Sequence, residues 1–190
     1  MKRKIVVASG NAGKLREIKA MLPDFEVTGY KDEGFDFEIE ENGQTFYENA
    51  LIKAKAVSDA LGVPALADDS GLVVEALDGA PGVYSARYAG DGDDKHNNQL
   101  LLKNMQGKTN RNAKFVCCLV YYTPEGGIIS ATGETHGKIM ESEQGENGFG
   151  YDPLFLSDDL GVSLGVAPPE LKNTISHRYR ALKELKERLK

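Results

Sequence analysis

Residues 45–76 read TFYENALIKAKAVSDALGVPALADDSGLVVEA, and this stretch indicates how the chain folds. Thr45 precedes Glu48 by three positions, the spacing of a capping box, which predicts that a helix begins here. Apolar side chains then recur at helical spacing until Gly62, which predicts the end of the helix. An apolar run over 65–67 predicts a short strand. A helix that leads directly into a strand is typical of an α/β fold.

The same alternation continues on both sides of this stretch. Further strands are predicted over 4–8, 25–28 and 72–76, and further helices over 13–22, over 93–105 and from Ser176 onward. Two long strand-like runs over 113–123 and 127–137 are joined by Pro-Glu-Gly, the pattern of a hairpin. Strands that alternate with helices pair in parallel, whereas a hairpin is antiparallel. We therefore expect an α/β fold with a mixed parallel/antiparallel sheet and flanking helices, as a single two-lobed domain over residues 1–190.

The composition is that of a globular protein: 190 residues, 41% hydrophobic and 27% charged, with a formal net charge of −6. A chain of this length can bury a sizeable core. No apolar run approaches membrane-spanning length, and the apolar stretch 5–8 is too short for a signal peptide, so we expect a cytoplasmic protein with no membrane partner. The acidic balance argues against nucleic-acid binding. The adjacent Cys117 and Cys118 are expected to be buried thiols.

A glycine-rich loop follows the first predicted strand and reads SGNAGK over 9–14. Free backbone N–H groups at the start of a helix attract anions, glycines let the backbone approach a ligand closely, and Lys14 adds a positive charge. The loop is not a Walker A motif, because Ala8 and Leu15 stand where that motif has Gly and Ser or Thr. A phosphate-binding loop and a plain strand–helix turn with an exposed lysine both fit this pattern.

Two acidic segments are candidates for metal binding and acid–base chemistry. The segment 68–71, Asp-Asp-Ser-Gly, is expected in a turn at the carboxyl end of a strand, where ligands of open α/β sheets gather. Adjacent carboxylates there suit Mg²⁺ or the activation of a water, although Asp and Ser are also ordinary turn formers. Glu40 and Glu41 are by default a solvated acidic face. One of them becomes a candidate metal ligand because a site for Mg²⁺ and phosphate needs a second carboxylate besides the 68–69 pair.

Two further segments carry aromatic and basic side chains. The segment GFGYDP, residues 148–153, places Phe149 and Tyr151 between or beside glycines, either as a surface that stacks on a planar base or as a turn with its aromatics in the core. His177 and Arg178 occupy the first turn of the last predicted helix, where positive charge is unfavourable. Such a breach of a local rule is often functional, although the basic character of this helix continues beyond them.

Taken together, these segments describe a site for one kind of ligand, a Mg²⁺-bound nucleotide. The phosphates would contact the 9–14 loop and Lys172, and the metal would bind Asp69 with Glu40 or Glu41. The base would lie against Phe149, Tyr151, Asp152, His177 and Arg178. The sequence offers no evident Ser/His/Asp triad or Cys–His pair, so hydrolysis by metal-activated water is the simplest chemistry. The residues alone leave open which phosphate is attacked.

The sequence closely resembles the inosine/xanthosine triphosphate pyrophosphatase family over nearly its whole length. Six segments carry the resemblance in the same order: SGNAGK at 9–14, EENGQTFYENA at 40–50, ADDSGL at 67–72, GAPGVYSARYAG at 79–90, GFGYDP at 148–153 and ISHR at 175–178. The segment 164–171, with its double proline, departs from the acidic helical stretch expected there.

The resemblance implies hydrolysis of dITP, ITP and XTP to the nucleoside monophosphate and pyrophosphate, with Mg²⁺ as the cofactor, which removes deaminated purines from the nucleotide pool. It also implies a homodimer of elongated, two-lobed chains with the site in a central cleft. Asp69 would be the proton acceptor and, with Glu40, a metal ligand. The substrate would contact Ser9, Gly10, Asn11, Ala12, Gly13, Lys14, Ser70, Phe149, Gly150, Tyr151, Asp152, Lys172, His177 and Arg178.

Three alternatives stay open. A pyrophosphatase acting on other modified nucleotides would differ only in its substrates. A nucleotide-binding module without catalysis would be expected to lack the acids, whereas both acidic pairs are present here. A single-stranded nucleic-acid binder could use Phe149 and Tyr151 for stacking, but the acidic charge and the lack of a basic groove count against it.

Overall fold

The computed structural model describes residues 2–190. The described chain forms two compact units, each assembled from separate stretches of sequence. Unit 1 contains the residues up to Asp69, Cys117–Gly133 and Arg178–Lys190, and unit 2 contains Ser70–Val116 and Glu134–His177. The expectation of a single two-lobed domain stays a prediction. Within residues 2–190, no helix has the length and apolar character needed to cross a membrane.

The strands form one sheet in the order β2-β1-β3-β4-β5-β6. Their bounds are Arg3–Val7 (β1), Phe25–Gly29 (β2), Ala65–Val74 (β3), Asn112–Tyr122 (β4), Ile128–Ile139 (β5) and Phe155–Ser157 (β6). The α-helices are Ala12–Met21 (α1), Phe46–Leu61 (α2), Asp94–Asn104 (α3), Pro169–Lys172 (α4) and His177–Arg188 (α5). Short 3₁₀ helices lie at Glu75–Leu77 (η1), Gly82–Arg87 (η2) and Asp152–Leu154 (η3).

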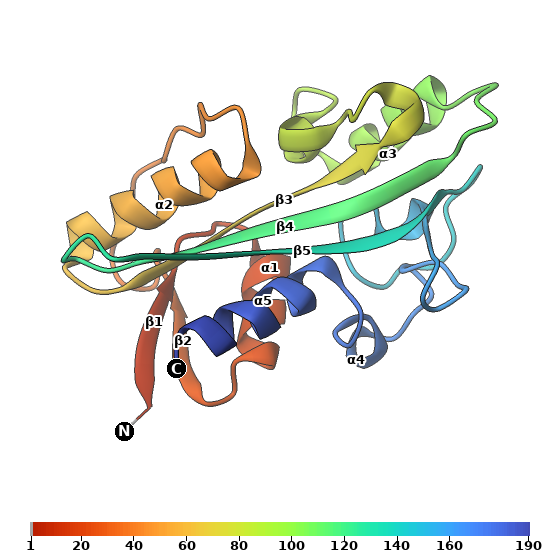
Figure 1. Cartoon of the computed structure of the whole chain (residues 1–190). Helices are drawn as coiled ribbons and strands as arrows, with labels where there is room; N and C mark the ends of the chain where they lie inside the picture. Colours follow the sequence, from red (N-terminus) through yellow and green to blue (C-terminus); the bar gives the residue numbers. More distant parts are fainter. Residues whose placement is uncertain (1) are drawn as a thin grey trace. The chain divides into compact units, whose positions relative to one another are not determined.

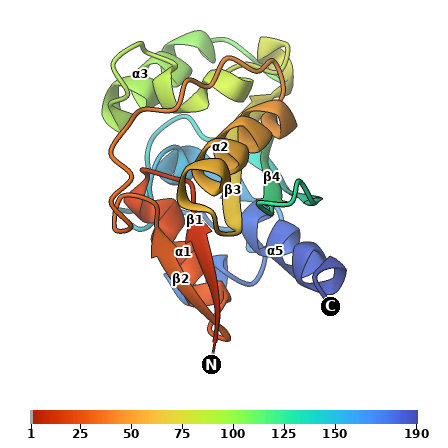
Figure 2. The ribbon, with the colours of Figure 1, turned by 90° about the vertical axis from the view of Figure 1, so that its left-hand side faces the viewer.

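The strand pairing confirms the predicted mixed sheet. β1 pairs in parallel with β2 and with β3, since α1 and α2 carry the chain back between these strands. Figure 2 shows β1 and β2 side by side with α1. β4 and β5 are neighbours joined by a tight turn, in which Thr123 N donates to Gly127 O over 3.0 Å, and β6 pairs antiparallel with β5.

The local signals around α2 are confirmed. The hydroxyl of Thr45 accepts a hydrogen bond from Glu48 N over 3.1 Å, and the Glu48 carboxylate accepts one from Gln44 N over 2.7 Å. These bonds satisfy backbone N–H groups that a helix start leaves unpaired. Gly62 ends the helix with a φ of 65°, a left-handed conformation that favours glycine.

In unit 1, alternate strand residues face two different helix layers (Figure 1). Ile5 and Val7 of β1 pack with α1 and α5, whereas Val6 lies in the cluster of small α2 side chains that includes Ala54. Side chains alternate between the two faces of a strand, so a strand covered by helices on both faces becomes a continuous apolar run. The sequence IVVA at 5–8 has that pattern.

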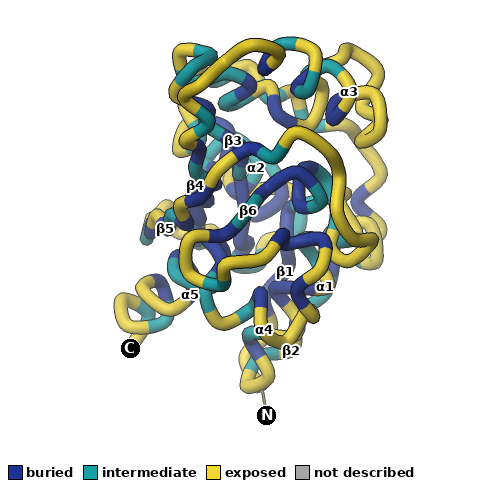
Figure 3. The backbone as a smooth tube through the Cα atoms, turned by 90° about the vertical axis from the view of Figure 1, so that its right-hand side faces the viewer, coloured by how far each residue is buried: buried dark blue, intermediate teal, exposed yellow. Residues whose placement is uncertain are grey.

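Unit 2 has its own core, in which Leu72 and Val74 of β3, Leu101 of α3, Phe115 of β4 and Phe155 of β6 pack together. The fully buried stretches appear dark blue in Figure 3, while most connecting loops are yellow. Each unit therefore holds a hydrophobic cluster of its own.

One element differs from its prediction. Residues 68–71 do not form a turn between two short strands, because β3 runs without interruption from Ala65 to Val74. Turn propensities of Asp, Ser and Gly are overridden here by pairing within the sheet. The two carboxylates consequently lie in the middle of a strand, where Asp68 is 0% and Asp69 is 8% exposed.

Candidate functional site

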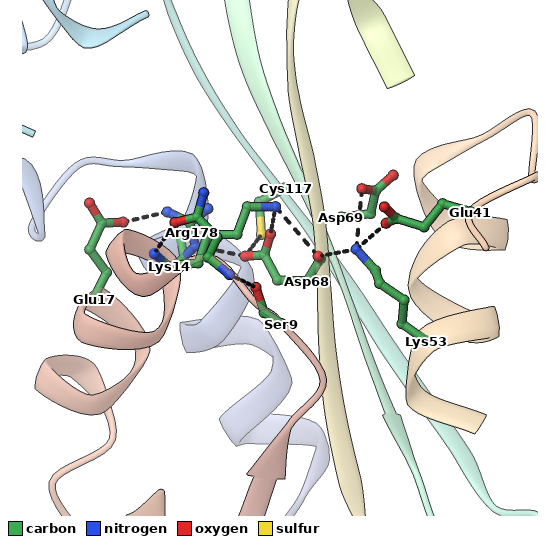
Figure 4. Close-up of polar contacts among 10 residues, drawn as sticks. Ser9, Lys14, Glu17, Glu41, Lys53, Asp68, Asp69, Cys117 and Arg178 are labelled. Atoms are coloured by element: carbon green, nitrogen blue, oxygen red, sulfur yellow. Dashed lines mark hydrogen bonds and ion pairs between the residues drawn. The ribbon is translucent and has the colours of Figure 1, made fainter. Parts of the chain in front are cut away.

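Asp68 and Asp69 are adjacent on β3 and therefore point to opposite faces of the sheet. Asp68 lies on the face covered by α1 and α5, and Asp69 on the face covered by α2 (Figure 4). Each carboxylate has ion-pair partners of its own, although the Lys14 ammonium beside Asp68 also acts to lower the pKa of Asp69. The charged side chains around the two aspartates thus form two groups, one on each face of the strand.

The first group is centred on the buried carboxylate of Asp68. It forms ion pairs with Lys14 Nζ at 2.9 Å and with Arg178 Nε at 2.6 Å, and it accepts a hydrogen bond from Cys117 Sγ at 3.2 Å. Arg178, 1% exposed, also pairs with Glu17 of α1. Burial acts to lower the pKa of Arg178, but the neighbouring carboxylates, Asp68 above all, outweigh it and raise the pKa above its ordinary range. Arg178 thus stays charged.

The second group is centred on Lys53 of α2. Its ammonium donates to the main-chain oxygen of Asp68 over 2.9 Å, lies 3.5 Å from Asp69 Oδ1, and forms an ion pair with Glu41. Glu40, the adjacent acid, is exposed. Lys53 therefore links Asp69 with Glu41 rather than with Glu40.

Asp69 combines burial with an unused oxygen. Within residues 2–190, its buried Oδ2 has no hydrogen-bond partner. Burial raises the pKa of Asp69, while Lys53 and Lys14 act to lower it. A carboxylate with a raised pKa and an uncommitted oxygen is suited to accept a proton.

The 9–14 loop leads from β1 into α1, as predicted. Asn11 caps the helix, because its side-chain oxygen accepts a hydrogen bond from Lys14 N over 3.0 Å, and Asn11 N donates to Ser9 Oγ over 3.2 Å. Gly10, Asn11 and Ala12 are exposed. A ten-residue helix thus presents an accessible N-terminus beside the Lys14 ammonium.

Three of the residues predicted to contact substrate come together in unit 2. Lys172 Nζ is 2.7 Å from Asp152 Oδ2 and lies 4.8 Å from the centre of the Phe149 ring. The same carboxylate oxygen accepts a hydrogen bond from Phe149 N over 3.0 Å. Lys172, 3% exposed, reaches this position from α4, directly after the segment 164–171 that departs from the family pattern. The lysine is nonetheless held firmly beside the aromatic loop.

Other residues predicted to contact the substrate are largely buried. Tyr151 is 5% exposed and belongs to the core of unit 2, where its hydroxyl donates to Ser85 O over 2.6 Å. Burial raises the pKa of this phenol. The His177 ring stacks on Phe115, with 5.0 Å between ring centres, and Ser70 follows Asp69 as a half-buried residue of β3.

Two residues of the charged groups lay outside the sequence-based predictions, Lys53 and Glu17. Lys53 is one of the two lysines in the sequence KAKA, residues 53–56 of α2, and only its orientation on the helix distinguishes it from the exposed Lys55. Glu17, 7% exposed, sits among the apolar positions Leu15 and Ile18 of α1. The position of Glu17 among apolar residues could have indicated a buried ion pair, because a buried carboxylate requires a charged partner.

The fold and these side chains define an α/β protein with a charged site suited to a phosphate-bearing ligand. The chain belongs to the Ham1 family, whose sequence profile matches residues 5–188. A solved structure of the Staphylococcus aureus Ham1 protein is 42% identical, with a TM-score of 0.88 and 98% coverage of both chains. This similarity agrees with the mixed α/β architecture described above.

Curated relatives are similar over most of their length. A protein of Deinococcus deserti named dITP/XTP pyrophosphatase is 50% identical over 185 residues, which cover 96% of this chain and 88% of that protein. A protein of Geobacter sulfurreducens with the same name is 49% identical, with 98% and 96% covered.

The buried ion pairs of Arg178 generate a stability prediction. Replacing Arg178 by Met removes the buried cation that pairs with both Asp68 and Glu17 and leaves Lys14 as the ion-pair partner of Asp68. The free energy of unfolding should therefore fall by about 3–5 kcal/mol. Arg188→Met, at the exposed end of the same helix, removes an ion pair with Glu184 and should cost less than about 1 kcal/mol. Urea unfolding monitored by circular dichroism measures both. Equal losses would contradict a special role for the buried pair.

Proposed function

We propose that this chain hydrolyses dITP, XTP and ITP to the nucleoside monophosphate and pyrophosphate, and so removes deaminated purines from the nucleotide pool. The observation that carries the proposal is Asp69, a buried carboxylate with an uncommitted oxygen, in a unit that also presents the N-terminus of α1 and Lys14. The names of the relatives from D. deserti and G. sulfurreducens support this choice of substrates.

Asp69 acts as the general base in this proposal. Its Oδ2 accepts a proton from the water that attacks the α-phosphate, and its burial favours proton uptake by raising the pKa. Lys53 holds Oδ1 of the same carboxylate and so directs the uncommitted oxygen toward the reaction. The bond between the α-phosphorus and the bridging oxygen breaks, and pyrophosphate leaves with the negative charge on that oxygen.

The phosphates bind to the 9–14 loop and Lys14. The exposed backbone N–H groups at the start of α1 provide donors, and the Lys14 ammonium, steered by Asp68, provides a positive charge. This arrangement holds the triphosphate and stabilises the charge that develops on its oxygens.

Mg²⁺ is the cofactor that the donor set fits. No group of three His, Cys, Asp or Glu side chains that could hold a metal occurs among residues 2–190. Magnesium, however, is usually bound by one or two carboxylates together with substrate phosphates. Asp69 and Glu41, which Lys53 brings together, provide that pair, and we assign the second ligand to Glu41 rather than Glu40. When bound, the ion would neutralise phosphate charge.

Unit 2 provides recognition of the base. Phe149 offers an aromatic ring for stacking on a purine, and the Lys172 ammonium lies against one part of that ring. Hypoxanthine and xanthine carry an oxygen at position 6 where adenine carries an amine, so a hydrogen-bond donor favours them over ATP. The active protein in this proposal is a cytoplasmic homodimer without nucleic-acid or membrane partners.

Product analysis tests the proposed function directly. The protein is incubated with Mg²⁺ and, separately, with dITP, ITP, XTP, GTP, ATP and dUTP, and the phosphorus products are identified by ³¹P NMR. We expect monophosphate and pyrophosphate from the deaminated purines, and no turnover once EDTA removes the metal. Orthophosphate and a diphosphate would place the attack at the γ-phosphate, turnover of dUTP alone would favour another specificity, and binding without turnover would favour a regulatory module.

Asp69→Asn tests the general base. The amide keeps the size of the side chain but does not accept the proton, so kcat for dITP should fall about 10²–10⁴-fold. The melting temperature should stay close to that of the unmodified protein. Asp59→Asn, on the exposed surface of α2, is the matched control and should retain full activity. Near-normal turnover by Asp69→Asn would remove this residue from the role.

Lys53→Met tests the electrostatic coupling to Asp69. The lysine lowers the pKa of Asp69, so its removal should raise that pKa further. The base acts when deprotonated, and the acidic limb of the kcat/KM profile for dITP should therefore move to higher pH. Lys55→Met is the control, because Lys55 pairs with Asp59 instead. An unmoved limb in Lys53→Met would show that the limb does not report Asp69.

A further inference from the structure

The loop that carries Phe149 is attached to helix α3 through a single glycine. Gly150 N donates a hydrogen bond to Asp94 Oδ2 over 2.9 Å, and Gly150 O accepts one from Asn98 Nδ2 over 3.1 Å. Asp94 and Asn98 are four residues apart and therefore lie on one face of α3. Both polar main-chain atoms of Gly150 are thus bonded to side chains of the same helix.

The conformation of Gly150 depends on this attachment. Its φ is +61°, in the left-handed region, and nothing lies within 4 Å of the position that a Cβ would take. Crowding therefore does not hold the glycine in place, and glycine has more conformational freedom than other residues. The hydrogen bonds from α3 restrict that freedom at the centre of the turn.

Asn98 is a buried amide, and the hydrogen bond to Gly150 is one of the contacts that satisfy it. Asn98 is 4% exposed, and its amide nitrogen donates to Gly150 O and to Glu143 Oε1, which is 3.0 Å away. Both partners are acceptors, so the orientation of the amide is fixed. Its Oδ1 is then a buried acceptor without a partner in the described chain. An apolar residue would avoid this unfavourable burial but would release Gly150.

The remaining residues of the turn are held from other directions. The Asp152 carboxylate is bound by Lys172 and by Phe149 N, and the Tyr151 hydroxyl is bound by Ser85 O. The ring of Phe149 is half-buried and keeps an accessible part. Positioning of that ring and of the adjacent peptide groups hence depends on Gly150 and on α3.

We propose that Asp94 and Asn98 are positioning residues for base recognition, which fix the 149–152 turn in the conformation that receives the purine. This inference rests on the proposed function, in which the turn contacts the base of dITP. In this proposal the side chains of Asp94 and Asn98 do not contact the reacting phosphate. Their loss should weaken binding of the substrate and leave the chemical step largely intact.

Steady-state kinetics with dITP, and with dGTP as the competing purine, test the proposal. Asn98→Ala and Asp94→Ala should each raise KM for dITP about tenfold, the effect of one lost hydrogen bond, while kcat changes less than about threefold. The preference for dITP over dGTP should narrow in both variants. Asp94→Asn keeps an oxygen that can accept from Gly150 N, so its KM should return close to the unmodified value.

Asn97→Ala is the matched control. Asn97 is the neighbouring residue of α3, 2% exposed, and it also makes two hydrogen bonds, one to Ala86 O and one from Ala89 N. Its loss should lower the melting temperature about as much as Asn98→Ala does, without a change of KM for dITP. The exposed Asp94 provides a variant that folds even where Asn98→Ala does not.

Three results would overturn the inference. An unchanged KM in Asp94→Ala would show that α3 does not control the turn, and an equal rise of KM in Asn97→Ala would show a general effect of stability. The absence of dITP turnover by the unmodified protein would overturn the proposed function as well, and this outcome is recognised before any variant is made.

Discussion

The arrangement of unit 1 depends on the buried carboxylate of Asp68. It fixes Lys14 on α1, Arg178 on α5 and the thiol of Cys117 on β4, and its main-chain oxygen receives the ammonium of Lys53 from α2. A buried carboxylate is unfavourable unless it is paired, and each partner is charged or a donor. One acid thereby connects four elements, and the side chains assigned to phosphate binding and to proton transfer take their positions from it.

The two units contribute different chemistry. Unit 1 carries Asp69, the proposed proton acceptor, and the accessible start of α1 that is proposed to bind phosphate. Unit 2 carries the turn with Phe149, in which Asp152 is paired with Lys172. Each unit holds a buried ion pair, Asp68 with Arg178 in unit 1 and Asp152 with Lys172 in unit 2, which rigidifies its surroundings. Such preorganisation is what a site needs to stabilise charge and to distinguish similar bases.

Much of the fold could be predicted from local signals, such as the capping box at Thr45 and the Gly62 end of α2. The error at residues 68–71 arose because turn-forming residues were read without the ion pairs that allow them inside a strand. Lys53 was missed for a similar reason, since its sequence does not distinguish it from Lys55, and only the packing of α2 does. Long-range partners, unlike helix caps, leave little trace in the neighbouring sequence.

The alternating side-chain directions along β3 limit insertions and deletions in this part of the sequence. Two consecutive aspartates serve opposite faces, one as the anchor of the helices and one as the proposed base. A residue inserted or deleted between Leu66 and Asp68 would move both aspartates to the opposite faces and would place Asp68 where the proposed base now lies. We therefore expect related chains to keep the same number of residues in this segment of β3, even where other positions are substituted.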